Sequence, residues 1–274
     1  MRCTCSMLVC YNRMNSYQGG TPMRYTDLIF DLYGTLVDIH TEENDTVWEK
    51  TALYFGYYGA KYTGEELNTD FKSVMTDRES AAGQSYEMFP DIPIEEVMAE
   101  LFRHKGVLEN SEILGFNAAQ VFRIASTEYI RLYDGVLEAL DKLRSKGFRL
   151  WLLSNAQRSF TAYELHHLGL GAQFDGIYLS SDHRFRKPDI RFFEALLQEQ
   201  QLDPRHCLMI GNDRETDIAG AKAAGLSTLY MHTNITPAHQ TKAKDGLLPG
   251  SSKRRKHFEF EGADWFMLSE LLCK

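Results

Sequence analysis

The stretch LIFDLYGTLVD, residues 28–38, decides the expected fold. Its apolar first half predicts a buried β-strand that brings Asp31 to the start of a tight turn, where Gly34 permits close approach of the backbone. Free backbone N–H groups in such a turn, together with the hydroxyl of Thr35, can hold an anion beside the carboxylate. A carboxylate aimed at a bound anionic group has the geometry for nucleophilic catalysis. Taken alone, the stretch also fits a strand that ends in an Asx turn.

Length and composition bound the class of protein. The chain has 274 residues, of which 43% are hydrophobic and 25% charged, enough for one large domain or a core domain with a smaller one. A net charge of -8 argues against a nucleic-acid partner. The short basic run Lys253–Lys256 is typical of a solvated loop. No apolar stretch approaches the ~20 residues of a membrane span, so no membrane partner is expected.

Cysteine usage and the first residues bear on location. The chain has five cysteines in irregular spacing, three of them within the first ten residues. An odd count without a regular pattern argues against a disulfide framework and predicts a reducing, cytoplasmic location. Residues 1–22 lack the apolar core of a secretory signal and show no periodicity, so we expect a disordered extension there.

Alternating strand and helix signals predict the architecture. Segments of helical period separate the later apolar runs, which indicates an α/β fold with a doubly wound parallel sheet. In such a sheet, the ligand site lies beyond the carboxyl ends of the strands. A last short strand and helix are expected within Phe258–Leu272. The five strand candidates are Asp27–Asp31, Phe148–Ser154, Gly176–Ser180, Cys207–Gly211 and Ser227–Tyr230.

The gap between the first and second strand candidates is too long for a simple crossover. Residues 41–130 contain helical periodicity and many aromatic side chains. We therefore expect an inserted all-helical cap subdomain at 41–130, and a catalytic core formed by 23–40 and 131–274. Because the cap follows the first strand directly, it would lie over the site, exclude water and select the substrate.

Polar side chains stand where the later strands end. Ser154 and Asn155 close the second run and open a helix, a place that suits an anion or simply a helix cap. Lys187 precedes Pro188 and is held in an extended conformation that can turn its charge toward the site, although alone it reads as an exposed lysine.

The fourth run ends in the acidic segment NDRETD, residues 212–217. Acidic residues four apart lie on one side of a helix and complement its dipole, so Asp213 and Asp217 could serve only as helix caps. At a strand end facing Asp31, however, the same carboxylates suit Mg²⁺, which takes oxygen ligands and usually only one or two protein carboxylates.

Taken in this order, the motifs resemble the haloacid dehalogenase-like hydrolase superfamily across roughly residues 25–232. The resemblance implies Asp31 as the nucleophile and Lys187 as the catalytic cation that neutralises charge. It also implies that Thr35, Ser154 and Asn155 bind the phosphate or carboxylate of a small anionic substrate. Over the expected cap, the resemblance is one of position and helical character alone.

The resemblance also implies a Mg²⁺ site. Its residues are Asp31, the main-chain carbonyl of Tyr33, and the acidic residues Asp213 and Asp217, which place or support the ion. Many relatives have aspartate at the position of Asn212, so either Asn212 or Asp213 is the residue on the metal side.

The residue at the position of Tyr33 differs between the family's phosphatases and its 2-haloacid dehalogenases. Phosphatases usually have an aspartate there that protonates the leaving alkoxide, and tyrosine, with a pKa near ~10, is a far weaker acid. The family's 2-haloacid dehalogenases have the same Asp-x-Tyr-Gly-Thr arrangement, because a leaving halide needs no proton. His40 is a candidate substitute acid, or simply a surface histidine beside an acidic run.

The acidic segment 212–217 favours a phosphatase instead. Family dehalogenases bind a carboxylate substrate and have a single acid at the position of Asp217, whereas Asp213 adds a charge that Mg²⁺ would cancel. We predict a Mg²⁺-dependent phosphatase that acts on a small phosphorylated metabolite with a good leaving group. The alternatives are a 2-haloacid dehalogenase and a catalytically silent anion-binding module.

Overall fold

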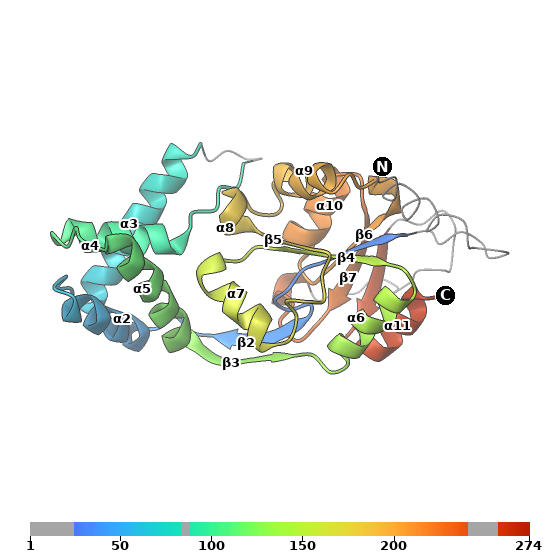
Figure 1. The fold of residues 1–274 in the computed structure, drawn as a ribbon, viewed down its shortest axis with the longest axis horizontal. Helices are drawn as coiled ribbons and strands as arrows, with labels where there is room; N and C mark the ends of the chain where they lie inside the picture. Colours follow the sequence, from blue (N-terminus) through green and yellow to red (C-terminus); the bar gives the residue numbers. More distant parts are fainter. Residues whose placement is uncertain (1–24, 84–87, 241–256) are drawn as a thin grey trace, which may run out of the picture.

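A computed structural model describes residues 25–83, 88–240 and 257–274 (Figure 1). The extension expected over residues 1–22 and the basic run Lys253–Lys256 lie outside the described residues. The described part is elongated, with a group of helices at one end and a central sheet covered by further helices at the other. No helix within the described ranges is both long and apolar enough to span a membrane.

The central sheet has six described strands in the order β5-β4-β1-β6-β7-β8, and every neighbouring pair is parallel. With β1 in the middle and crossovers to both sides, this is the predicted doubly wound α/β fold. The strands are β1 (Asp27–Phe30), β4 (Arg149–Ser154), β5 (Gly176–Leu179), β6 (Cys207–Gly211), β7 (Ser227–His232) and β8 (His257–Glu261).

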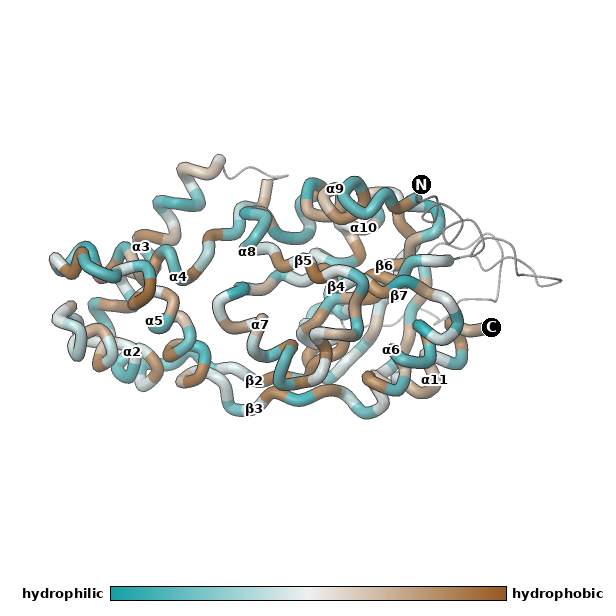
Figure 2. The backbone as a smooth tube through the Cα atoms, in the orientation of Figure 1, coloured by the Kyte–Doolittle hydropathy of each residue, from teal (hydrophilic) through white to brown (hydrophobic). Residues whose placement is uncertain are grey.

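Both faces of the sheet are buried, which explains the nearly continuous apolar runs in its strands. Within β1, Leu28 and Phe30 join one buried cluster, and Ile29 joins another on the opposite face. Figure 2 shows hydrophobic segments where strands cross the core, whereas colours alternate along the surrounding helices. The covering helices are α6 (Val136–Ser145), α7 (Arg158–His167), α8 (Ser180–His183), α9 (Ile190–Glu199), α10 (Ala219–Ala223) and α11 (Trp265–Leu272).

An insertion follows β1. The antiparallel strands β2 (Val37–Thr41) and β3 (Thr127–Leu132) lead into and out of it. Between them lie α2 (Asp45–Tyr57), α3 (Gly64–Ala81), α4 (Ile94–His104) and α5 (Ser111–Ser126).

The inserted helices have local start signals and a separate interior. The side chain of Asn44 caps α2, and Thr63 with Glu66 forms a capping box at α3. A separate buried cluster fills the interior, with Trp48 and Phe55 among its members. The boundaries expected at 40/41 and 130/131 fall inside β2 and β3, and the division of the chain into two units stays a prediction.

Each of the five strand candidates overlaps an observed strand, with ends that differ by at most two residues, and β8 and α11 occupy the last expected strand and helix. The pair β2–β3 was not predicted. Its residues are short, partly exposed runs, and their pairing joins segments that are far apart in sequence. Such a pairing leaves no local periodic signal.

Candidate active site

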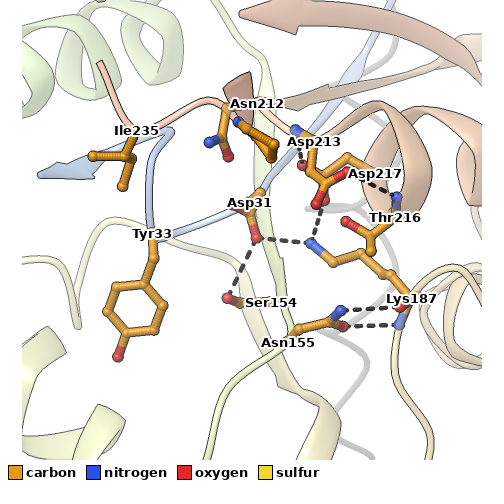
Figure 3. Close-up of a pocket in the computed structure, with 11 residues that line it drawn as sticks. Asp31, Tyr33, Ser154, Asn155, Lys187, Asn212, Asp213, Thr216, Asp217 and Ile235 are labelled. Carbon is orange, nitrogen blue, oxygen red and sulfur yellow. Dashed lines mark hydrogen bonds and ion pairs between the residues drawn. The ribbon is translucent and has the colours of Figure 1, made fainter. Parts of the chain in front are cut away.

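A cavity of about 230 Å³ opens at the carboxyl ends of β1, β4 and β6 (Figure 3). This is where a doubly wound sheet places its ligand. The lining residues come from segments that are widely separated in the sequence and include seven of the eight predicted site residues, all but Thr35. They are Asp31, Tyr33, Ser154, Asn155, Lys187, Asn212, Asp213, Thr216, Asp217, Ile235 and Pro237.

Asp31 stands at the centre of this cavity. Its backbone N–H donates to the carbonyl of Ile210 at 3.0 Å, which extends the sheet ladder one step beyond β1 and fixes the direction of the side chain. The carboxylate lies near two hydroxyl groups, Thr35 Oγ1 at 3.3 Å and Ser154 Oγ at 3.4 Å. Although Thr35 is not a cavity-lining residue, its hydroxyl reaches Asp31, so the structure brings the predicted nucleophile and hydroxyl groups together.

Gly34 allows the loop that follows Asp31 to approach Asn212, at the start of the acidic segment 212–217. Its φ is +83°, a conformation that favours glycine. A Cβ atom there would lie 2.2 Å from Nδ2 of Asn212. The loop is fixed further by Thr233, whose hydroxyl donates to the Gly34 carbonyl at 2.7 Å. A side chain at position 34 would therefore be strained and would displace the amide of Asn212.

Lys187 links the nucleophile to the fourth motif. Its Nζ lies 2.7 Å from Asp31 Oδ1 and 2.6 Å from Asp217 Oδ1, and it also donates to the Leu153 carbonyl at 2.8 Å. The side chain is 1% exposed. Burial lowers the pKa of the ammonium, but the carboxylates of Asp217 and Asp31 outweigh this and raise the pKa overall. Lys187 is therefore a cation held against two carboxylates.

Asn155 holds Lys187 in place. Its Nδ2 donates to the Lys187 carbonyl at 3.0 Å, and its Oδ1 accepts from the Lys187 N–H at 2.8 Å. The resemblance implies a substrate-binding role for Asn155. Because both ends of the amide contact the main chain of Lys187, the structure gives Asn155 a positioning contact within the site.

The two acidic residues of the fourth motif have different surroundings. Asp217 is 1% exposed and accepts the Asp213 N–H at Oδ2, 3.0 Å away. Burial raises the pKa of Asp217, while the Lys187 ammonium opposes the rise. Asp213 Oδ1 accepts the N–H groups of Glu215 and Thr216 and caps the π-helical turn η2 (Arg214–Ile218).

Asn212 contacts a hydroxyl group that also reaches Asp31. Its Oδ1 is 3.3 Å from Thr35 Oγ1, the hydroxyl that also reaches Asp31. Asp213 lines the same cavity through a side chain that is anchored to η2. Both residues border the space beside Asp31, so either one can contribute an oxygen there.

The phenol of Tyr33 points away from the cavity centre (Figure 3). Its hydroxyl bonds to Glu164 and lies 3.0 Å from Thr161 Oγ1, both on α7. Burial and the negative charge of Glu164 raise the pKa of Tyr33, although the nearby Arg123 opposes them. This hydroxyl is a hydrogen-bond donor to Glu164 and is unsuited to protonate a leaving group.

The oxygen donors beside Asp31 suit Mg²⁺. Among residues 25–83, 88–240 and 257–274, no three His, Cys, Asp or Glu side chains gather around one point. Mg²⁺ does not require such a group, because it takes one or two carboxylates and keeps several waters. Oδ2 of Asp31 has one long contact, to Thr35, and the carboxylate of Asp213 lines the same cavity. All these donors are oxygens, so the residues fit the ion.

Sequence reasoning missed one wall of the cavity. Ile235 and Pro237 follow β7 and are the aliphatic residues among those that line it. The strand-end rule could have found them, because β7 ends at the same edge as β1. His40, by contrast, is not a lining residue, and its exposed ring lies 3.6 Å from Glu128 on β3.

The sequence matches the haloacid dehalogenase-like hydrolase family over residues 28–225. One curated relative is a glyceraldehyde 3-phosphate phosphatase from Methanothermobacter thermautotrophicus, 34% identical over 43% of this chain and 53% of its own length. The match therefore spans about half of that relative. A pyrimidine 5'-nucleotidase, PynA from Streptococcus pneumoniae, is 24% identical over 82% of this chain and 94% of its own.

Solved structures share the fold. The crystal structure of a 2-haloacid dehalogenase from Pseudomonas syringae has a TM-score of 0.59 and 20% identity, and covers 90% of this chain and 98% of its own. At this level of identity, the likeness concerns the fold alone.

Proposed function

The chain belongs to the haloacid dehalogenase-like hydrolases, and on that premise we propose that it is a Mg²⁺-dependent phosphatase with Asp31 as its nucleophile. The observation that carries the proposal is the charge of the cavity. Three carboxylates line it, from Asp31, Asp213 and Asp217, against the single ammonium of Lys187. A carboxylate substrate without a metal would meet a net negative site, whereas a phosphate accompanied by a divalent cation would not.

The names of relatives support the same class of reaction. The relatives from Methanothermobacter thermautotrophicus and Streptococcus pneumoniae are named as a glyceraldehyde 3-phosphate phosphatase and a pyrimidine 5'-nucleotidase. The partial match to the first does not define a substrate for this chain. A small anionic phosphoester is therefore the proposed substrate class, without a nucleic-acid or membrane partner. The cytoplasmic location expected from the cysteines remains part of this proposal.

Mg²⁺ would be held by the Asp31 carboxylate and the Tyr33 carbonyl, and Asp213 or Asn212 would provide a further oxygen ligand. Asp217 would support the site through its contact with Lys187. When bound, the ion supplies positive charge that offsets the carboxylates and the phosphoryl group. The protein's own contribution is to hold oxygen donors on rigid strand ends.

The reaction would take place in two steps. Asp31 attacks phosphorus in line, so that a carboxylate oxygen–phosphorus bond forms as the bond to the leaving oxygen breaks. Water then attacks phosphorus, releases inorganic phosphate and restores the carboxylate. Lys187, Thr35 and Ser154 stand within hydrogen-bond reach of the Asp31 carboxylate and would donate to the phosphoryl oxygens.

The proposed leaving group is one that needs little protonation. The Tyr33 hydroxyl donates a hydrogen bond to Glu164 and lies outside the reacting region, so it cannot take the role of the missing acid. Ile235 and Pro237 add an aliphatic wall to the cavity. Acyl and aryl phosphates combine a good leaving group with an apolar surface and are the proposed preference.

The test is a panel of acetyl phosphate, p-nitrophenyl phosphate and 2-chloropropionate, each with MgCl₂ or with EDTA. We expect phosphate release that requires MgCl₂ and disappears in Asp31→Asn. Chloride release that persists in EDTA would assign a dehalogenase instead. Neither product, together with binding of inorganic phosphate, would assign the silent anion-binding module.

A further inference from the structure

Tyr33 connects the loop that follows Asp31 to the helices α7 and α5. It lies two residues after Asp31, and its phenol reaches α7, where it donates to Glu164 and contacts Thr161 at 3.0 Å. Arg123 of α5 donates two hydrogen bonds to the Glu164 carboxylate, from Nε to Oε1 at 2.6 Å and from Nη2 to Oε2 at 3.1 Å. The nucleophile loop, a core helix and the last helix of the insertion therefore meet at one carboxylate.

The cluster is largely buried. Only 16% of the Arg123 side chain and 13% of the Glu164 side chain are exposed. The guanidinium also lies 5.2 Å from the centre of the Tyr33 ring and 4.7 Å from that of Phe160. Each polar partner of Tyr33 is thus enclosed, which restricts the phenol to one orientation.

Stability alone is a weak explanation for this arrangement. Burying an ion pair costs desolvation, and well-packed apolar residues often stabilise a fold equally well. A phenylalanine at position 33 would fill the same space and would need no buried carboxylate. The ion pair of Glu164 with Arg123 fixes the direction of the Tyr33 side chain, two residues after Asp31. The orientation of the Asp31 carboxylate in turn controls the rate of the reaction.

We propose that Glu164 is a positioning residue, which holds Asp31 in its reactive orientation through the phenol of Tyr33, and that Arg123 makes this support depend on the docking of α5. The inference rests on the proposed phosphatase function. Arg123 is suited to the link because its carbonyl also accepts from Thr127 at the start of β3, where the chain leaves the insertion.

A second tyrosine–glutamate pair in the same chain provides a matched control. Tyr178 on β5 donates to Glu199 on α9 at 2.8 Å, on an element pair that does not carry the nucleophile. Neither residue lines the cavity. Tyr178→Phe and Glu199→Gln remove the same kinds of atoms as Tyr33→Phe and Glu164→Gln.

The test measures kcat and KM for p-nitrophenyl phosphate with MgCl₂ in the four single variants, in the Tyr33→Phe/Glu164→Gln double variant and in wild type. We expect Tyr33→Phe and Glu164→Gln each to lower kcat by about tenfold or more while KM changes little, because the misplaced group is the nucleophile. The double variant should be no worse than the poorer single one, since both changes break one contact. The control variants should keep both constants.

Melting temperatures and far-UV spectra separate positioning from folding. Equal losses of kcat in both pairs, or a lower melting temperature with an unchanged kcat in the Tyr33 pair, would overturn the inference. A change confined to KM would also overturn it, because it would assign Glu164 to substrate binding. A wild type that hydrolyses no phosphoester would instead refute the proposed function, and the inference with it.

Discussion

The carboxyl edge of the sheet and the interior of the inserted helices use their side chains differently. At the sheet edge, buried charges from distant segments meet, as in the contacts of Lys187 with Asp31 and Asp217. Inside the insertion, the core is apolar and rich in aromatic rings, with Phe55 stacked on Phe102 at a centroid distance of 4.0 Å. No described residue of α2, α3, α4 or α5 lines the cavity. The cavity is therefore built by residues of the core, at and beyond the strand ends.

The insertion reaches the site through contacts at its border. The Asp91 N–H donates to the Arg184 carbonyl at 3.0 Å, and the Arg186 N–H donates to the Phe89 carbonyl at 2.9 Å. These two bonds pair the segment before α4 with the segment that leads directly to Lys187. We therefore expect substitutions at the sheet edge to lower the rate of phosphate release strongly. Substitutions inside the insertion should lower the free energy of unfolding, and those at the border should lower it less.

The largest effect is expected for Lys187→Met. Two buried carboxylates would lose their cation, so phosphate release should fall by about 10³-fold or more, and the free energy of unfolding by about 3–5 kcal/mol. Steady-state kinetics and urea unfolding measure both. Lys142→Met is the control, because Lys142 bonds to Glu270 on the far side of the core. Equal activity in the two variants would contradict the role assigned to the sheet edge.

Phe55→Ala tests the interior of the insertion. Phe55 is fully buried, so its truncation should lower the free energy of unfolding by about 3–5 kcal/mol. Well below the melting temperature, kcat for p-nitrophenyl phosphate should remain that of wild type. Phe192→Ala makes a similar cavity in the core beside α9 and serves as the comparison. A selective loss of kcat in Phe55→Ala would show that the insertion interior takes part in the chemistry.

Gln157→Ala tests the border. The side chain of Gln157 donates to Asp91 at 3.0 Å and accepts the Ile94 N–H at 2.9 Å, which ties the start of α7 to the insertion. Its loss should lower the free energy of unfolding by about 1–3 kcal/mol, since the Ile94 N–H loses its acceptor and the buried Asp91 carboxylate loses one of its donors. Urea unfolding checks this, with the exposed Gln198→Ala as control. Identical stabilities would mean that the tie contributes nothing.

The smallest effect concerns pH and Asp38 on β2. Burial would raise the pKa of Asp38, but hydrogen bonds from Asn234 and Arg131 outweigh it and hold the pKa below its usual range. A depressed folded pKa stabilises the fold above the unfolded value, near ~4, and this contribution is lost as the pH falls through the folded pKa. The melting temperature of wild type should therefore exceed that of Asp38→Asn at neutral pH, and the gap should close in acid. A gap independent of pH would contradict the assigned cause.

Local patterns predicted the strands and their polar ends, because each depends on residues adjacent in sequence. The apolar run before Asp31 and the polar residues after β4 and β6 were visible in this way. The partners of Tyr33 were not, because Glu164 lies on a helix 131 residues away and its sequence neighbourhood has no unusual feature. Side-chain direction at Tyr33 depends on long-range packing, so the sequence could suggest two chemistries there and not which way the phenol points.

The most direct test is an acid-quenched single turnover of wild type with a phosphoester and MgCl₂, followed by mass spectrometry of the peptide that contains Asp31. We predict a phosphoryl group on that carboxylate, and no such adduct in Asp31→Asn. Phosphate release by wild type at a rate that Asp31→Asn retains would contradict it.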